Sequence, residues 1–223
     1  MTISCPGCQA NLLAHHTLDD FEVKPARNKS RIIHPKCTSC GHIIQLSEVS
    51  TNITPATKIL LITGTCGAGK TSIGQLIESK SDYIFIDGDS IMRRDNHYAR
   101  KHGKPQHSSD LCTDSVINTV LTIAALGHNV VIGYIINNPK TLAQYETPLK
   151  NHGITPTLRV LIPKRDICQE RNIQRDCWTA DEEWIDKYYE EMQNFQATHQ
   201  ACCIDTSKET LEETFANHFA KIL

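Results

Sequence analysis

One eight-residue segment constrains the fold of this chain more than any other feature. Residues 64–71 read GTCGAGKT, which matches the pattern G-x-x-x-x-G-K-[ST] at every fixed position. The segment follows the apolar run Ile59–Thr63 and precedes a helical stretch, Thr71–Ser79. A strand, a loop of this kind and a helix, in that order, are the context that a phosphate-binding loop requires.

The residue types of this segment suit a bound triphosphate. Glycines let the backbone curl closely around an anion, and backbone N–H groups at the start of a helix point toward phosphate oxygens. Lys70 would neutralise the β- and γ-phosphates, and the Thr71 hydroxyl would bind Mg²⁺. We therefore expect ATP and Mg²⁺ as cofactors. The residues expected to bind the nucleotide here are Gly64, Thr65, Cys66, Gly67, Ala68, Gly69, Lys70, Thr71 and Ser72.

Short apolar runs alternate with amphipathic stretches after the loop. Near-continuous apolarity indicates parallel strands buried on both faces. The alternation predicts an α/β fold, a doubly wound parallel sheet of five strands flanked by helices. The expected strands are Lys58–Thr63, Tyr83–Asp87, Asn129–Ile136, Thr157–Ile162 and Ala201–Asp205. The expected helices include Asp110–Leu126, Thr141–His152, Lys164–Arg175 and Leu211–Ile222, the last with a capping box of Thr210 and Glu213.

Two acidic residues, Asp87 and Asp89, end the second expected strand. An acid at the carboxyl end of a parallel strand lies beside the ligand crevice. One of the two could order Mg²⁺ while the other accepts the proton of an acceptor hydroxyl. The alternative is a turn in which Asp89 or Ser90 is the N-cap of the next helix. A GTPase of the Ras type is disfavoured, because no N-K-x-D motif follows the loop.

Together these segments resemble small-molecule kinases of the P-loop superfamily. The most similar groups are adenylylsulfate kinase, gluconate and shikimate kinases, chloramphenicol phosphotransferase and polynucleotide 5′-kinase. The resemblance spans Lys58 to Leu223 and lies in residues 64–71, 87–89, 93, 171–175 and 205–207. It implies that Asp89 orients or deprotonates the acceptor, that Asp87 is the acid on the metal side, and that Arg93 binds the acceptor.

The resemblance also implies a lid over the transferred phosphoryl group. Arg171 and Arg175 are four residues apart on an expected helix, so they would share one face, and the guanidinium group matches phosphate oxygens. The alternative is a solvated basic face that is salt-bridged to Glu170 or Asp176. Residues 181–191 are acidic and are most simply a solvated helix face. The segment Asp205, Thr206 and Ser207 is expected to border the adenine.

The acceptor side carries a local positive charge. Basic residues gather between positions 93 and 107, where only Asp95 opposes them: Arg93, Arg94, His97, Arg100, Lys101, His102, Lys104 and His107. Such a cluster could attract a phosphorylated metabolite, a nucleotide or a nucleic-acid end, or it could be an ordinary surface loop. The third expected strand has no acid at its end, which leaves Thr71 and Asp87 to hold Mg²⁺.

The first 50 residues contain two Cys-x-x-Cys pairs. Cys5, Cys8, Cys37 and Cys40 have the residue type and spacing of a closed tetrahedral Zn²⁺ site, with His34 and His42 as alternative ligands. We expect residues 1–50 to form a zinc-ribbon-like module, a β-hairpin with a long loop and Arg31–His34 as its returning strand. Residues 51–57 would be a linker and residues 58–223 the kinase domain. The module could contact a protein or the acceptor, or be purely structural.

Composition excludes several other classes. The chain has 223 residues, a net charge of −2 and 39% hydrophobic residues, which suits a packed domain with a small appendage. No secretory signal or membrane-length apolar run is present, so we expect a reducing, cytoplasmic location. The leading hypothesis is ATP-dependent phosphorylation of a hydroxyl on a small, perhaps anionic, molecule. A nucleic-acid or nucleotide 5′-kinase, and an ATP-switched binding or regulatory module, remain alternatives.

Overall fold

The computed structural model describes residues 22–25, 31–34, 40, 57–103, 109–125, 127–175 and 179–223. Five parallel strands form its central sheet in the spatial order β4-β5-β3-β6-β7. These strands are β3 (Ile59–Gly64), β4 (Tyr83–Asp87), β5 (Asn129–Gly133), β6 (Thr157–Leu161) and β7 (Cys203–Ile204). The expected five-stranded parallel sheet is therefore confirmed.

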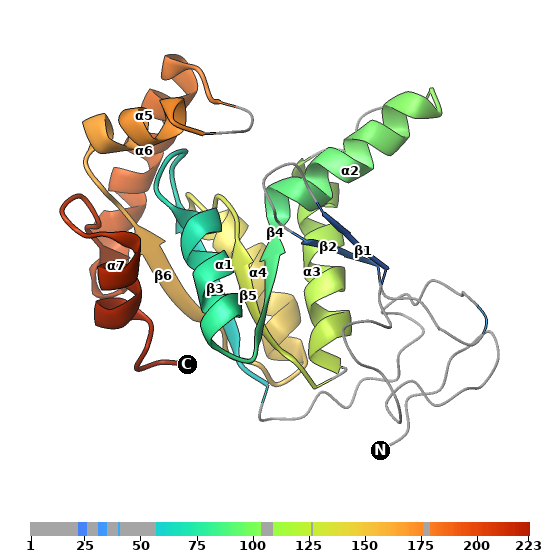
Figure 1. Cartoon of the computed structure of the whole chain (residues 1–223). Coiled ribbons are helices and arrows are strands. Elements are labelled where there is room, and N and C mark those ends of the chain that lie inside the picture. The colour runs from blue at the N-terminus through green and yellow to red at the C-terminus, as the bar shows by residue number, and fades with distance from the viewer. Residues whose placement is uncertain are drawn as a thin grey trace.

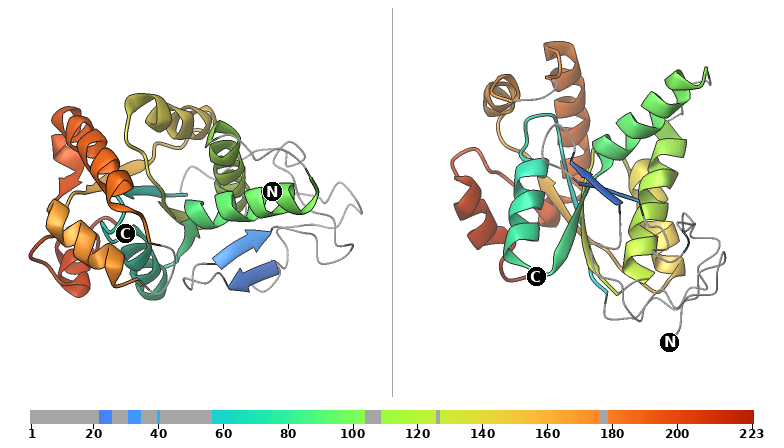
Figure 2. Two further views of the ribbon diagram at one scale, coloured as in Figure 1. Left: turned by 90° about the horizontal axis from the view of Figure 1, so that it is seen from above. Right: turned by 45° about the vertical axis from the view of Figure 1, so that its right-hand side comes forward.

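Helices cover both faces of this sheet (Figure 1; Figure 2). Helices α3 and α4 pack with one set of strand residues, and α1 and the C-terminal segment pack with the alternate set. Helices α2, α5 and α6 rise beyond the edge where the strands end (Figure 1). The helices are α1 (Lys70–Lys80), α2 (Gly88–Lys101), α3 (Ser109–Ala125), α4 (Pro139–Asn151), α5 (Arg165–Ile173), α6 (Glu182–Thr198) and α7 (Leu211–His218), with a short 3₁₀ turn, η3 (Gln200–Cys202), before β7.

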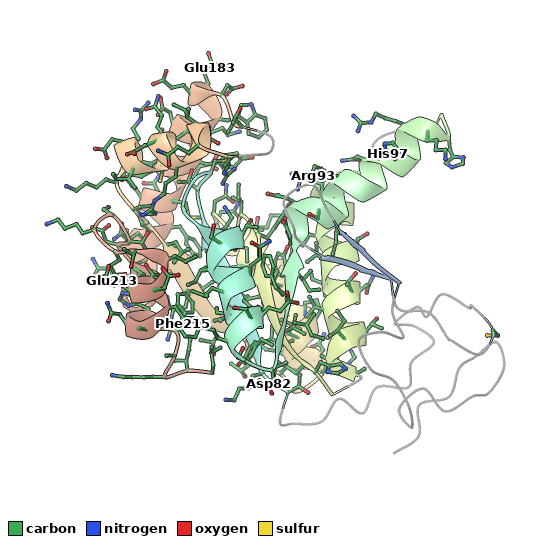
Figure 3. All side chains as sticks on the ribbon, viewed as in Figure 1. Asp82, Arg93, His97, Glu183, Glu213 and Phe215 are labelled. Atoms are coloured by element: carbon green, nitrogen blue, oxygen red, sulfur yellow. The ribbon has the colours of Figure 1, made fainter. Side chains whose placement is uncertain are left out.

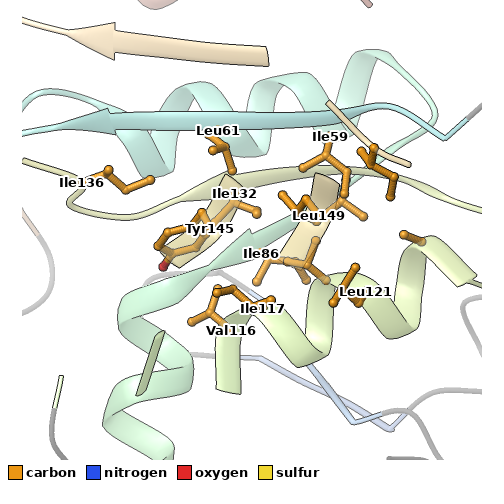
Figure 4. Packing of buried hydrophobic residues seen from close by; sticks show 14 of the residues in the cluster. Ile59, Leu61, Ile86, Val116, Ile117, Leu121, Ile132, Ile136, Tyr145 and Leu149 are labelled. Atoms are coloured by element: carbon orange, nitrogen blue, oxygen red, sulfur yellow. The ribbon is translucent and has the colours of Figure 1, made fainter. Parts of the chain in front are cut away.

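Strand residues alternate between two apolar cores because successive side chains point to opposite faces. Ile59 and Leu61 of β3 belong to the core on the α3 and α4 side, and Leu60 and Ile62 belong to the other core. All six β3 residues are buried. Figure 4 shows the first core, where Tyr145 and Leu149 of α4 and Val116, Ile117 and Leu121 of α3 meet the strands. The unbroken apolarity of the strands thus reflects burial on both faces.

Two expected elements end earlier than the sequence suggests. β5 ends at Gly133, because the backbone of Ile136 bonds to a side chain instead of to a neighbouring strand. The Ile136 N–H donates to Thr63 Oγ1 at 2.7 Å, and the Ile136 carbonyl accepts from the same hydroxyl at 3.0 Å. α7 ends at His218 rather than at Ile222. The capping box of Thr210 and Glu213 at its start is confirmed.

Two other boundaries move for reasons of capping and turn formation. α4 begins at Pro139, two residues earlier than expected, because the Asn138 side chain accepts a hydrogen bond from the Thr141 N–H at 2.9 Å. α5 ends at Ile173, so the expectation of a helix through Arg175 is wrong. The chain turns there because the Asn172 amide bonds to the backbone of Ala180 in both directions.

A two-stranded antiparallel hairpin precedes the sheet. β1 (Glu22–Pro25) pairs with β2 (Arg31–His34), which confirms the expected returning strand. The hairpin lies beside β4 and α2 (Figure 2). Within the described ranges, no helix has both the length and the apolar character needed to cross a membrane.

Candidate active site

The loop between β3 and α1 is shaped by glycines in conformations that other residues avoid. Gly67 and Gly69 have φ values of +80° and +99°, in the region that glycine enters without steric cost. A Cβ on Gly64 would lie 2.4 Å from the Leu161 carbonyl oxygen, so β6 approaches the loop closely. A Cβ on Gly69 would meet nothing within 4 Å. The loop therefore presents an open backbone concavity at the carboxyl edge of the sheet.

Lys70, the first residue of α1, lies folded over this loop. Its Nζ donates hydrogen bonds to the Gly64 and Thr65 carbonyl oxygens, both at 2.9 Å. Burial lowers the pKa of Lys70, and the Asp89 carboxylate is the largest of the opposing influences. An ammonium group that is held by two loop carbonyl oxygens can exchange these contacts for phosphate oxygens.

A buried hydroxyl beside Lys70 also lacks a partner. Thr65 Oγ1 has no hydrogen bond within the described part of the chain, although the residue is 2% exposed. Unsatisfied buried polar atoms are uncommon and need an explanation. A ligand with several acceptor oxygens would satisfy this donor, so the loop residues fit a bound triphosphate.

Asp87 ends β4 with both carboxylate oxygens engaged. Oδ1 accepts from the Asp89 N–H and Oδ2 accepts from Ser90 Oγ, each at 3.0 Å. Asp87 is only 3% exposed. It therefore serves the first turn of α2 in the manner of an N-cap, a role that the sequence alternative gave to Asp89 or Ser90.

Asp89 lies two residues after Asp87, in the first turn of α2. Burial raises the pKa of its carboxyl group, and the nearby Asp87 raises it further. Lys70, Arg93 and Arg175 oppose this shift. Three cations from three different parts of the chain thus lie within electrostatic range of one carboxylate.

Arg93 follows Asp89 by one helical turn. Its Nη2 lies 3.4 Å from Ser90 Oγ and 3.8 Å from Asp87 Oδ2, and its side chain is 48% exposed. Figure 3 shows it near the base of α2, with His97 further out along the helix. Because these contacts are long and the side chain is half exposed, the guanidinium can turn toward a ligand at low cost.

The two arginines expected to form a lid occupy different places. The Arg171 guanidinium donates from Nη1 to Thr206 Oγ1 at 3.2 Å and from Nη2 to the Thr206 carbonyl at 2.9 Å. Arg175 lies beyond the end of α5, and its charge influences the pKa values of Lys70, Cys66 and Asp89. The expectation that both share one helical face is wrong, because α5 ends between them.

On α5, Arg165 forms salt bridges. Its guanidinium bonds to Asp186 Oδ1 at 2.5 Å and to Glu182 Oε1 at 2.9 Å, both on α6. These partners differ from the expected Glu170 and Asp176, the second of which lies outside the described residues. The ion pairs hold α5 and α6 together as one hairpin. Glu182 and Asp186 are therefore more than a solvated face, although both remain exposed.

The segment Asp205 to Ser207 is a tight turn after β7. Asp205 Oδ1 accepts from the Ser207 N–H at 2.9 Å and from Ser207 Oγ at 2.5 Å, and these bonds lower the pKa of Asp205. The Lys164 N–H donates to Ser207 Oγ at 2.7 Å. The turn is thus tied to the start of α5 through Lys164 and to its end through Arg171.

A family model described as an AAA domain matches residues 59–194. The chain belongs to this AAA domain family. Its matched region runs from β3 through most of α6 and includes the loop, Asp87, Asp89, Arg171 and Arg175. None of the curated proteins compared with the AAA-domain chain matches its sequence.

Solved structures show that this AAA-domain chain has a P-loop kinase fold. The tunicamycin resistance protein of Deinococcus radiodurans is 14% identical, with 74% of this chain and 95% of that chain covered and a TM-score of 0.56. A gluconokinase from Sinorhizobium meliloti 1021 is 18% identical, with coverages of 70% and 86% and a TM-score of 0.52. A sugar kinase from Janibacter sp. HTCC2649 is 14% identical, with coverages of 72% and 91% and a TM-score of 0.50.

Three site features of the AAA-domain chain were missed by sequence reasoning. The Asn172 amide donates to the Ala180 carbonyl at 2.9 Å and accepts from its N–H at 3.0 Å, which shapes the segment that carries Arg175. Asn137, after β5, donates to Glu191 of α6. Tyr188 packs with the buried cluster around Cys66. No local pattern marks these residues, because their partners come from distant segments.

The zinc site expected in the AAA-domain chain stays a prediction. Cys5, Cys8 and Cys37 lie outside the described residues, and Cys40 is described and exposed. The expected linker, residues 51–57, is described only at Thr57. Among the described residues, no group of three or more His, Cys, Asp or Glu side chains is arranged to hold a metal ion.

Proposed function

We propose that the protein is an ATP-dependent phosphotransferase that moves the γ-phosphate to a hydroxyl of a small, anionic acceptor. The observation that carries this proposal is that Lys70 and Asp89 lie close enough to influence each other electrostatically. Lys70 is the cation of the phosphate-binding loop, and Asp89 is a partly buried carboxylate within electrostatic range of it. An ATP-switched module needs only a cation such as Lys70, whereas a kinase needs both this cation and a carboxylate such as Asp89.

Each loop residue has a role in holding ATP. The backbone N–H groups of residues 64–72 would bind the phosphates, and Lys70 would leave its two carbonyl partners for the β- and γ-phosphates. The Thr71 hydroxyl and the Asp87 carboxylate would hold Mg²⁺, which neutralises charge on the phosphates when it is bound. Asp87 also fixes the first turn of α2, so one residue would link the metal side to the acceptor side.

Asp89 would accept the proton of the acceptor hydroxyl. A carboxyl group whose pKa is raised by burial is a stronger base than an exposed one, and a pKa nearer to neutrality favours general base catalysis. Arg93, one turn later, would bind an anionic group of the acceptor. The charge of the half-exposed Arg93 side chain supports this role.

The two lid arginines would act at opposite ends of ATP. Arg171 holds the turn at Thr206, so it would fix the adenine side formed by residues 205–207. Arg175 lies within electrostatic range of Lys70 and Asp89, so it would stabilise charge on the transferred group.

A transfer assay tests this proposal. Purified protein is incubated with γ-labelled ATP, Mg²⁺ and a panel of hydroxyl compounds, with and without anionic groups. We expect little ATP hydrolysis until an acceptor is added, and Asp89→Asn should abolish transfer while ATP still binds. Vigorous hydrolysis without acceptor, retained in Asp89→Asn, would instead support an ATP-switched module.

A further inference from the structure

Tyr134 lies directly on the glycine that separates the two aspartates of the site. A Cβ on Gly88 would be 2.5 Å from Tyr134 Cδ2 and 2.9 Å from Tyr134 Cγ. Among the described residues, and apart from the backbone of α2 itself, the three atoms nearest to this Cβ all belong to the Tyr134 side chain. The ring therefore rests on the backbone that joins Asp87 to Asp89.

The Tyr134 ring is held by α2 and by the buried core at the same time. Gly88 and Met92 are four residues apart on α2, so they lie on one side of the helix. The Tyr134 hydroxyl donates to Met92 Sδ at 3.8 Å. The ring also meets that of Tyr145, with centroids 6.2 Å apart and an interplanar angle of 46°. Because Tyr145 is fully buried in α4, this contact gives the Tyr134 ring a fixed support.

The backbone of Tyr134 is attached to the strand that leads into the phosphate-binding loop. Its N–H donates to the Ile62 carbonyl at 3.1 Å, two residues before Gly64. The preceding residue, Gly133, is paired with Ile62 of β3 and with Asp87 of β4. Tyr134 thus contacts β3 through its backbone and α2 through its ring, which fixes the first turn of α2 relative to the loop.

Most of α2 projects away from the sheet, so its direction depends on its first turns. The helix rises beyond the edge where the strands end (Figure 1), and it is exposed at Arg93, His97 and Arg100. The bonds that Asp87 accepts fix the start of the helix to the end of β4, but they join residues of a single turn. A contact from another segment, such as the Tyr134 ring, is needed to fix the orientation of the helix around that turn.

We propose that Tyr134 is a positioning residue for phosphoryl transfer, and this inference rests on the proposed function. Its ring holds the first turn of α2 in the orientation that directs the Asp89 carboxylate to the reacting hydroxyl. The phenol hydroxyl is not needed for this role, because ring atoms make the contact with Gly88. A displacement of Asp89 by about 1 Å is enough to slow transfer by about 100-fold.

Single-turnover hydrolysis of ATP tests the proposal without an acceptor. Protein in excess over γ-labelled ATP is incubated with Mg²⁺, and water takes the place of the acceptor hydroxyl. The water oxygen bonds to the γ-phosphorus as the bond to the β–γ bridging oxygen breaks, ADP leaves, and the water proton goes to Asp89. We expect Tyr134→Ala to lower this slow rate by about 100-fold, as Asp89→Asn does, with an unchanged Kd for ATP. Tyr134→Phe should retain most of the rate.

Gly88→Ala gives a reciprocal test from the other side of the contact. Gly88 has no positive φ, so alanine there meets the Tyr134 ring and no backbone strain. We expect Gly88→Ala to slow hydrolysis by about tenfold or more. In a Tyr134→Ala background the same change should cause no further loss of rate, and it should raise the melting temperature because alanine favours a helix more than glycine does. Independent, multiplicative losses would contradict the proposal.

Tyr83→Ala is the matched control, because it removes a buried ring from the other end of the strand that carries Asp87. It should lower the melting temperature and leave the hydrolysis rate of the folded protein unchanged. A rate loss in Tyr83→Ala as large as that in Tyr134→Ala would overturn the positioning role. Parental rates in Tyr134→Ala, or a loss in Tyr134→Phe equal to that in Tyr134→Ala, would overturn it too.

Failure of the proposed function gives a different result. In that case the parent protein does not bind ATP, or its hydrolysis is unaffected by Asp89→Asn. Binding of ATP and a rate that depends on Asp89 but not on the ring of Tyr134 would leave the kinase intact and remove the positioning role alone.

Discussion

Gly67 of the phosphate-binding loop lies directly against Cys168 of α5. A Cβ on Gly67 would be 2.0 Å from the Cys168 carbonyl oxygen and 3.0 Å from its Cα. The neighbouring atoms are backbone, so they cannot move aside as a flexible side chain could. Helix α5 therefore packs on the loop only because residue 67 has no side chain.

Gly67→Ala should destabilise the protein by more than its backbone strain. Gly153→Ala is the matched control, because Gly153 has a similar φ of +75° but has nothing within 4 Å of a Cβ. We expect about 1–2 kcal/mol for Gly153→Ala from the positive φ, and roughly 2 kcal/mol more for Gly67→Ala from the clash. Urea denaturation of the two variants measures the difference, and equal losses would contradict the close packing of α5 on the loop.

The Asn172 clamp, formed by the two hydrogen bonds between the Asn172 amide and the Ala180 backbone, should stabilise the folded protein. Asn172→Ala would leave the Ala180 N–H and carbonyl without the partner that both use now, and residue 172 is 2% exposed. We expect a loss of about 2–3 kcal/mol in unfolding free energy. Asn151→Ala, at an exposed position on α4, should change it by less than about 0.5 kcal/mol.

The activity of the Asn172→Ala variant tests whether Asn172 positions Arg175. Because the clamp shapes the segment that holds Arg175, Asn172→Ala should lower kcat at temperatures where the protein is still folded. Retained kcat in a folded Asn172→Ala variant would show that the clamp stabilises the hairpin without positioning the arginine.

The two lid arginines should give different kinetic effects. Arg175→Ala should lower kcat by about 10³-fold with a small change in the KM for ATP, as expected for an arginine that stabilises the transferring group. Arg171→Ala should mainly raise the KM for ATP, because its guanidinium supports the turn at Thr206. Equal effects on kcat from both variants would contradict the separate roles.

Asp89 should make stability depend on pH. Because its folded-state pKa is raised above its usual value, the folded protein binds more protons than the unfolded chain between the two pKa values. Stability therefore falls as pH rises through this window, and each pH unit between the two values corresponds to about 1.4 kcal/mol. Asp89→Asn should raise the melting temperature at neutral pH, and this gain should shrink as pH falls toward 4. A gain that is constant with pH, or a loss at neutral pH, would contradict the desolvation of the Asp89 carboxylate in the folded protein.

The sheet and the loop could be predicted from sequence because their signals are local. The run from Ile59 to Ile62 is apolar throughout, and GTCGAGKT matches a pattern with known chemistry. The capping box at Thr210 and Glu213 is also local, and it is confirmed. Even the early hairpin strand Arg31–His34 is found where its residues suggest it.

The surroundings of Arg175 and Asp89 could not be predicted because they depend on contacts between different segments of the chain. Periodicity placed Arg171 and Arg175 on one helix, whereas the side chain of Asn172 ends that helix by bonding to Ala180. A strand pattern extended β5 to Ile136, whereas the Thr63 hydroxyl takes its backbone groups. Only the fold brings Tyr134 onto Gly88 at the start of α2. The same holds for Tyr188 of α6, which packs on the buried cluster around Cys66.

ATP binding by Lys70 is the central claim, and calorimetric titration of ATP in the presence of Mg²⁺ tests it most directly. Lys150→Met is the matched control, because Lys150 is an exposed residue of α4 that is paired with Glu146. We expect the parent protein and Lys150→Met to bind ATP with the same Kd, and Lys70→Met to weaken binding by about 100-fold or more, since charge-assisted contacts to phosphate are lost in a buried site. Absence of ATP binding by the parent protein, or unaltered affinity in Lys70→Met, would contradict the account.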